Sequence, residues 1–219
     1  MIPLRDDRTP GRFPAVTVLI ITVNVAVFVY QVFFGRLSFD AYIETLGLIP
    51  TRVSALWRGV QLHQGVPPLL TVFTAMFMHG GFLHILGNMW FLWIFGGNVE
   101  GALGRSRFVL FYLITGVISF LAHVAVHPMS HVPLVGASGA IAGILGAYFV
   151  LFPTNRILTL IPIFFFVTTV RIPAAFFLGI WFLMQFLYSS MGGQVAWWAH
   201  IGGFVSGMIL VRFFLPRRR

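Results

Sequence analysis

The chain lacks several residue types that soluble proteins commonly contain. Its 219 residues include no cysteine and no lysine, and all five carboxylates lie before residue 101. The absence of cysteine excludes disulfides and thiolate metal ligands. Charged residues make up 9% of the chain and hydrophobic residues 58%, whereas a soluble domain has about 25% charged residues. This composition excludes an ordinary soluble domain and indicates a membrane protein.

The hydrophobic residues form blocks that are long enough to cross a bilayer. A spanning helix needs about 20 mostly apolar residues. Six blocks approach this length, at 15–34, 80–97, 107–126, 138–152, 173–190 and 196–215. No small-residue cleavage site follows the first block, so we expect a retained helix and not a signal peptide. The sequence therefore predicts one all-α membrane domain over residues 1–219, with termini too short for a regulatory domain.

All 14 basic residues are arginines, and their placement predicts the orientation of the chain. If the N-terminus is cytoplasmic, eleven of them lie in cytoplasmic segments or at helix ends, and three lie in the loop between the first two spans. Because arginine is enriched on the cytoplasmic side, we expect both termini inside and an even number of spans. Despite the net charge of +9, this dispersed pattern favours membrane anchoring over nucleic-acid binding.

The loop 35–68 is too long and too apolar for a simple connector. Residues 38–46 mix large apolar and acidic side chains, as an interfacial helix does, and the stretch around Leu56 and Trp57 is similar. We expect this loop to lie on or in the outer membrane interface. A soluble extracytoplasmic hairpin is the alternative.

The fourth span is short, and a serine stands at its start. A helix from Ser138 to Pro153 rises only about 22 Å, against a hydrocarbon core of about 30 Å. If its inner end reaches the cytoplasmic interface, Ser138 lies below the outer surface. The segment 131–137 must then dip into the bilayer, which is tolerated only where protein or water surrounds the backbone. We therefore expect a water-filled cavity that opens outward, with Ser138 near its floor.

Three other polar residues are expected at the same depth as Ser138. His84 and Asn88 are four residues apart on the second span and share a helical face. His200 follows a tryptophan pair suited to the interface, within the first turn or so of the sixth span. A polar side chain inside a membrane costs free energy unless it is paired or faces water, so such residues are candidates for function. Small residues that would let the fourth and sixth spans approach closely are Gly139, Gly143, Ala147, Gly203 and Gly207.

Four motifs, in this order along the chain, resemble those of the rhomboid family of intramembrane serine proteases. The second span resembles the histidine-rich helix of that family, through His79, His84 and Asn88. The E-x-x-x-G-R turn is matched by Glu100, Gly104 and Arg105, and the G-x-S-G motif by residues 136–139. The A-H-x-x-G-x-x-x-G helix is matched by Ala199, His200, Gly203 and Gly207.

This resemblance implies a six-span rhomboid-like bundle of the compact prokaryotic type, in a bacterial or archaeal inner membrane. It implies a serine endopeptidase without cofactor or metal, with Ser138 as nucleophile and His200 as general base. The oxyanion would be stabilised by His84, Asn88 and the backbone N–H of Ser138. Because no carboxylate falls in a span, we expect a Ser–His dyad and not a triad. Supporting roles would fall to Gly136, Gly139, Gly203 and Gly207, and to Glu100 and Arg105 as a turn pair.

Two positions depart from the family pattern. Well-studied members carry a tyrosine four residues after the serine, packed against the base, but this chain has Ala142. What orients His200 is therefore open, and another aromatic residue is one candidate. A Trp-Arg pair of the first loop in some members does not align with Trp57 and Arg58, to which we assign no catalytic role.

Alternative functions follow from other features of the sequence. His123, His127 and His131 suggest either a metal site or, without nearby acids, a hydrated loop.

The implied substrates are transmembrane segments of other membrane proteins, and the uncharged link 191–195 is a candidate gate. One alternative is an inactive relative that binds membrane proteins, which would be expected to lack the serine or the histidine. Another is a small transporter, which would be expected to carry acidic residues inside the membrane. The oligomeric state stays open.

Overall fold

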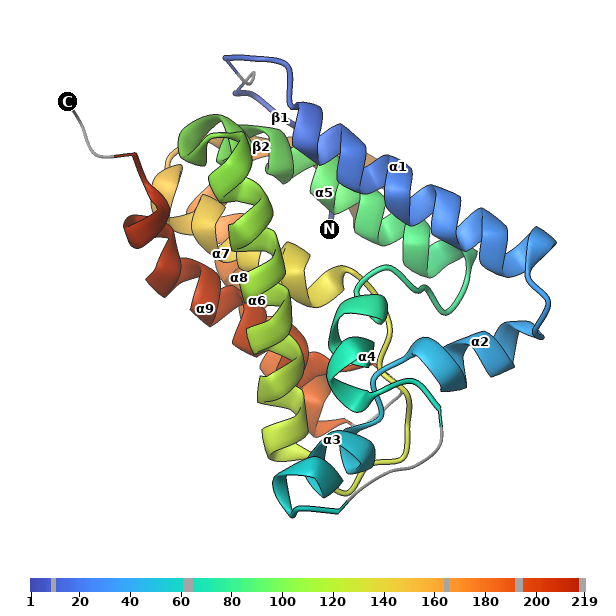
Figure 1. Cartoon of the computed structure of the whole chain (residues 1–219). Helices are drawn as coiled ribbons and strands as arrows, with labels where there is room; N and C mark the ends of the chain where they lie inside the picture. The colour runs from blue at the N-terminus through green and yellow to red at the C-terminus, as the bar shows by residue number, and fades with distance from the viewer. Residues whose placement is uncertain (9–10, 61–64, 164–165, 192–194, 217–219) are drawn as a thin grey trace.

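The computed structural model of the chain is mostly helical, with one small antiparallel sheet (Figure 1). It describes all residues except 9–10, 61–64, 164–165, 192–194 and 217–219. The elements in chain order are β1 (Ile2–Asp6), α1 (Ala15–Val29), the π-helical η1 (Tyr30–Phe34), α2 (Phe39–Leu46), α3 (Pro50–Trp57), α4 (Pro68–Thr74), α5 (Phe82–Leu103), α6 (Arg105–Val126), α7 (Ser138–Leu151), β2 (Arg156–Ile163), β3 (Phe166–Pro173), α8 (Ala174–Ser190) and α9 (Trp197–Phe214).

Four helices in the described part of the chain are long and apolar enough to cross a membrane. They are the continuous α1–η1 helix over Ala15–Phe34, then α5, α6 and α9. The helices α7 and α8 are apolar but shorter, with 14 and 17 residues. These six helices lie within a few residues of the six predicted blocks, except that α5 continues six residues further, to Leu103. The chain is thus a mostly helical membrane protein.

The short helix α7 lies at the centre of the bundle. All of its residues from Gly139 to Tyr148 are buried, and it packs against α5, α6, α8 and α9. A helix that is apolar on every side must be covered by protein or by lipid, and here neighbouring helices cover α7. Because protein surrounds α7, its N-terminus does not have to reach the membrane surface.

Backbone hydrogen bonds satisfy the irregular segment that leads into α7. The N–H of Leu134 donates to the carbonyl of Leu48 at 2.7 Å, and the N–H of Leu48 donates back at 3.0 Å. The N–H of Gly136 donates to the carbonyl of Ala75 at 2.8 Å. Buried backbone groups need such partners. The loop between the first two spans, which contains helices α2 and α3, therefore holds the chain just before Ser138.

The prediction of an all-α fold is wrong in one region, where three strands pair in the order β1-β2-β3. In the first pair Ile2 lies opposite Leu160, and Asp6 lies opposite Ile157. The segment 156–173 is rich in the β-branched residues that favour strands. The pairing of β1 with β2 was not predicted, because these strands are far apart in sequence and local periodicity does not reveal such pairing. The β2–β3 hairpin is local, and its β-branched residues were a signal for it.

Asp6 ties this sheet to the helical bundle. Its carboxylate accepts a hydrogen bond from the hydroxyl of Tyr148 on α7 and another, at 2.6 Å, from Asn98 Nδ2 on α5. Trp90 Nε1 on α5 also donates to the carbonyl of Pro3 at 2.7 Å. Burial raises the pKa of the Asp6 carboxyl, and these side-chain hydrogen bonds oppose the shift. The N-terminal strand thereby fastens α5 to α7.

Glu100 does not form the predicted turn pair with Arg105. Its carboxylate accepts hydrogen bonds from the N–H of Val16 at 3.0 Å, the N–H of Thr17 at 2.8 Å and Thr17 Oγ1 at 2.8 Å. The first N–H groups of a helix have no partner within it, and a carboxylate also interacts favourably with the positive end of the helix dipole. Glu100 therefore caps α1, whereas Arg105 is exposed at the start of α6.

Replacement of Glu100 by glutamine is expected to destabilise the protein. One carboxylate oxygen becomes an NH₂ group that faces backbone donors, and a buried donor without an acceptor costs about 1–3 kcal/mol. For a chain of this size we expect the Tm in detergent to fall by roughly 3–10 °C. Glu44→Gln is the control, since Glu44 is exposed on α2. Equal melting temperatures for Glu100→Gln and wild type would contradict the capping role.

Candidate active site

Ser138 and His200, 62 residues apart in sequence, are hydrogen-bonded to each other. Ser138 Oγ lies 2.9 Å from Nε2 of His200. Ser138 is the first residue of α7, and His200 lies in the first turn of α9. Both side chains are half-buried. A hydroxyl at this distance from an imidazole nitrogen is a nucleophile and base within reach of proton transfer.

Glycines bring the backbones of α7 and α9 into contact below this pair. A Cβ atom added to Gly203 would overlap the carbonyl of Gly139, and one added to Gly207 would overlap the carbonyl of Gly143. Ala142 Cβ would lie only 3.2 Å from a Cβ at Gly203. The small residues at these positions therefore set the distance between the helices that carry Ser138 and His200.

His84 and Asn88 lie on one face of α5, next to the segment that precedes Ser138. The N–H of Gly80 donates to Nδ1 of His84 at 3.3 Å, so in the neutral ring the proton is on Nε2. Asn88 is 7% exposed, and its Nδ2 is buried without a hydrogen-bond partner in the described structure. Two donors, His84 Nε2 and Asn88 Nδ2, thus have no hydrogen-bond acceptor among the described residues.

Gly136, two residues before Ser138, lies against both of these donors. A Cβ atom at Gly136 would lie 2.7 Å from His84 Nε2 and 3.6 Å from Asn88 Nδ2. The backbone φ of Gly136 is +121°, a value that side-chain-bearing residues rarely adopt. Glycine at this position is required both by the conformation and by the space, two residues before Ser138.

Three side chains contact the imidazole of His200, whose orientation Ala142 left open. The imidazole is flanked by Trp181, with ring centroids 6.1 Å apart, and by Trp197, at 5.9 Å and nearly perpendicular. Gln185 Oε1 on α8 lies 2.9 Å from His200 Nδ1. Ala142 itself is fully buried. Sequence reasoning missed Gln185, although its amide within the apolar block 173–190 was a signal of the kind that marked Asn88.

Among the described residues, no other histidine is hydrogen-bonded to Ser138 or His200. His79 is fully buried and packs edge-on against His84, with ring centroids 5.3 Å apart. The rings of His123 and His127, at the end of α6, are tilted by 50° with centroids 5.0 Å apart. Among the described residues, no group of three or more His, Cys, Asp or Glu side chains is placed to hold a metal ion.

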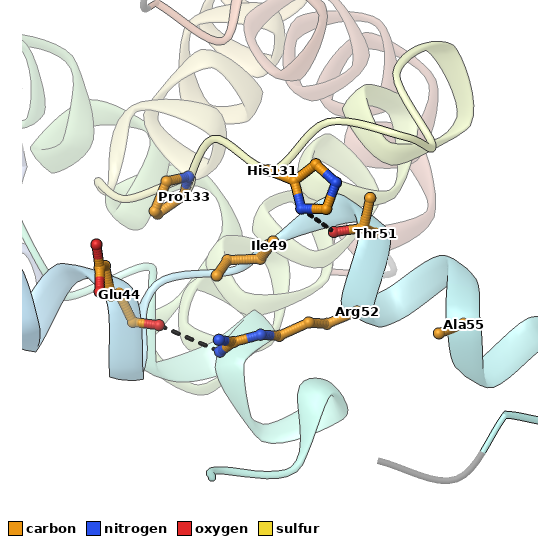
Figure 2. Close-up of a pocket in the computed structure, with 7 residues that line it drawn as sticks. All are labelled: Glu44, Ile49, Thr51, Arg52, Ala55, His131 and Pro133. Carbon is orange, nitrogen blue, oxygen red and sulfur yellow. Dashed lines mark hydrogen bonds between the residues drawn. The ribbon is translucent and has the colours of Figure 1, made fainter. Parts of the chain in front are cut away.

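A pocket of about 450 Å³ lies between the loop 35–68 and the segment that precedes α7 (Figure 2). His131 Nδ1 lies 3.4 Å from Thr51 Oγ1 there, and Arg52 Nη1 donates to the carbonyl of Glu44 at 3.2 Å. None of Ser138, His200, His84 and Asn88 lines this pocket. It is therefore distinct from the expected cavity around the serine.

The candidate gate 191–195 and the pair Trp57 and Arg58 lie in or next to loops. Residues 192–194 of the candidate gate lie outside the described residues. Trp57 ends α3, and Arg58 Nη1 lies 3.9 Å from Met129 Sδ, with neither residue at the Ser138–His200 pair.

Comparison with known proteins identifies the family of this chain. Residues 67–217, which include α5 to α9 and the Ser138–His200 pair, match the model of the Rhomboid domain. The chain belongs to the rhomboid family. The matched rhomboid domain leaves out the first span and most of the loop 35–68. In the structure α1 packs against α5, and α3 packs against α6.

Individual rhomboid proteins from several organisms are similar to this chain. It is 32% identical over 133 residues to the rhomboid protein YdcA of Bacillus subtilis (strain 168), which covers 58% of this chain and 66% of the relative. It is 28% identical over 181 residues to the mitochondrial presenilin-associated rhomboid-like protein of Rattus norvegicus, with 74% and 45% covered. The RHOMBOID-like protein 5 of Arabidopsis thaliana is 35% identical over 118 residues, with 52% and 37% covered. The alignments thus span two thirds or less of the length of these relatives.

Proposed function

We propose that this protein is an intramembrane serine endopeptidase that cleaves transmembrane segments of other membrane proteins with a Ser–His dyad. Membership of the rhomboid family supports this reaction class. The observation that carries the proposal is the 2.9 Å hydrogen bond between Ser138 Oγ and His200 Nε2. Two donors that face Gly136, on His84 and Asn88, have no acceptor in the described part of the chain that would compete with a substrate oxyanion.

In the first half of the reaction Ser138 is acylated. Its Oγ attacks the carbonyl carbon of the scissile peptide while His200 Nε2 takes the hydroxyl proton. The tetrahedral intermediate collapses as Nε2–H delivers that proton to the leaving amine, and the C–N bond breaks. In the second half His200 takes a proton from water, the hydroxide attacks the acyl-serine, and the serine regains its proton as the carboxylic acid product leaves.

The oxyanion of each tetrahedral intermediate would lie beside Gly136. His84 Nε2–H and Asn88 Nδ2–H point to that side, and the N–H of Ser138 at the start of α7 is a third donor. N–H groups in the first turn of a helix have no partner within it and lie at the positive end of its dipole. Fixed donors of this kind stabilise developing charge most effectively where water is scarce.

The membrane topology belongs to the same proposal. We assign α7 and α8 as the two further spans, which gives six spans with both termini in the cytoplasm of a bacterial or archaeal cell. The arginine distribution supports this orientation. The active site then lies in the outer half of the membrane, and water for hydrolysis enters from the outer face. A substrate helix would have to unwind there, because its backbone carbonyls are otherwise hydrogen-bonded.

An inactive family member that only binds membrane proteins is the second candidate. It is less well supported, because binding alone does not require a serine hydroxyl on an imidazole nitrogen. A covalent probe separates the two. A fluorophosphonate is expected to label the purified wild-type protein in detergent, and Ser138→Ala is expected to give no label. Labelling of both proteins at the same rate, or of neither, would favour the binding protein.

Removal of either proposed oxyanion donor is expected to slow cleavage. His84→Ala and Asn88→Ala should each lower kcat by about 10²–10³-fold, because the interaction strengthens in the transition state. KM for a tagged single-span substrate should change little. The matched control is Asn155→Ala, whose side chain donates to Tyr148 Oη, away from the serine. Equal kcat values for Asn88→Ala and Asn155→Ala would remove Asn88 from the oxyanion site.

A further inference from the structure

We propose that Gln185 is a positioning residue that fixes the tautomer and the orientation of His200. This inference rests on the proposed function for its catalytic consequence, but the tautomer itself is a property of the folded protein. The supporting geometry is a chain of hydrogen bonds through Trp181, Gln185, His200 and Ser138. It links α8 to α9 and to the start of α7.

The orientation of the Gln185 side-chain amide follows from its own hydrogen bond within α8. Gln185 Nε2 donates to the carbonyl of Trp181, one turn earlier in α8, at 2.7 Å. A carbonyl only accepts, so the atom of Gln185 that faces it must be the NH₂ group. The opposite orientation would put two oxygens in contact. The amide oxygen Oε1 is therefore the atom that faces His200.

The contact with Gln185 determines which ring nitrogen of His200 carries the proton. Gln185 Oε1 lies 2.9 Å from His200 Nδ1, and an amide oxygen can only accept a hydrogen bond. Nδ1 must therefore carry a proton. In the neutral ring this leaves the lone pair on Nε2, which is the nitrogen that lies 2.9 Å from Ser138 Oγ. The base is thus ready to take the serine proton, whereas the other tautomer would present an N–H to the hydroxyl.

Burial makes this arrangement persistent. Gln185 is 4% exposed, so water does not compete readily for its oxygen. The imidazole is also confined between Trp181 and Trp197. In a serine protease triad a carboxylate holds the same nitrogen. Here a neutral amide takes that place, which avoids a buried charge inside the membrane but stabilises the imidazolium less strongly.

Because Gln185 lies on α8, the base is held by a different helix from the one that carries it. A movement of α8 away from α9 would lengthen the Nδ1 hydrogen bond, whereas the Ser138 contact joins α7 and α9 and does not involve α8. The protonation of His200 Nδ1 therefore depends on the position of α8. A hydrogen bond from a residue of α9 itself would not create this dependence.

The first test measures the tautomer and needs no substrate. The protein is labelled with ¹⁵N-histidine, and the His200 signals are assigned by comparison with His200→Asn. We expect the neutral ring of wild-type His200 to carry its proton on Nδ1 and to have an unprotonated Nε2. A wild-type ring with the proton on Nε2 would overturn the inference, whatever the protein catalyses.

The second test uses Gln185→Met, which keeps the length of the side chain and removes both hydrogen bonds. We expect kcat for a tagged single-span substrate to fall about 10-fold, the equivalent of one lost hydrogen bond, with KM within twofold of wild type. In the same variant the His200 proton should redistribute between the two nitrogens. The control is Ser189→Ala, a half-buried α8 residue whose hydroxyl donates to the carbonyl of Phe186.

The outcomes separate this inference from the proposed function. If wild type cleaves and Ser138→Ala does not, but Gln185→Met keeps the wild-type kcat, Gln185 does not position the base. A change in KM alone would also contradict the inference. If wild type neither cleaves nor reacts with a fluorophosphonate, the proposed function fails, and the ¹⁵N spectrum still decides whether Gln185 sets the tautomer.

Discussion

Ser138→Ala and His200→Ala are each expected to lower kcat/KM for a single-span substrate by about 10⁴-fold or more. Without the hydroxyl no acyl-enzyme forms, and without the imidazole the hydroxyl is not deprotonated as it attacks. The two losses should not add in the double variant, because the residues act as one unit through the 2.9 Å hydrogen bond. The measurement is the rate of product formation with purified protein in proteoliposomes, with the cut site identified by mass spectrometry.

Matched variants make this prediction specific. Ser206→Ala removes a buried hydroxyl of α9 that donates to the carbonyl of Gly203, and His131→Ala removes an exposed imidazole beside Thr51. Both controls should cleave at about the wild-type rate. Cleavage by Ser138→Ala at the same rate as Ser206→Ala would show that another group is the nucleophile.

Gly207→Ala is expected to disrupt the bundle, although only one methyl group is added. Its Cβ would overlap the backbone of Gly143, and neither helix backbone can move aside as a flexible side chain would. Overpacking in a core costs about 1–3 kcal/mol and sometimes more, so we expect the Tm in detergent to fall by roughly 10 °C. Separation of α7 from α9 should also pull His200 from Ser138, with loss of cleavage.

Gly179→Ala is expected to change the Tm in the opposite direction. Gly179 lies within α8, and a Cβ there would meet no atom within 4 Å. Alanine in a helix is favoured over glycine by about 1 kcal/mol, so this variant should keep or raise the Tm. If Gly207→Ala and Gly179→Ala melt at the same temperature, close approach at Gly207 does not hold the two helices together.

The sequence determined the class of the protein because its signals are local. Apolar blocks, arginine placement and the short fourth block can all be seen within windows of about 20 residues, the length that a bilayer requires. The helix bounds of the structure follow them closely. The residues of the candidate site were also visible from sequence, since Ser138, His200, His84 and Asn88 are polar groups in apolar surroundings and occur in rhomboid motifs.

The tertiary structure alone decided what joins distant segments. β1 pairs with a strand about 150 residues later, and Glu100 caps α1 instead of pairing with the nearby Arg105. The same holds for His200: the sequence left open what orients it, with Ala142 in place of a tyrosine, and did not show that Gln185 Oε1 lies 2.9 Å from its Nδ1. Hydrogen-bond partners depend on which helix faces pack together, and neither hydropathy nor spacing along the chain specifies that packing.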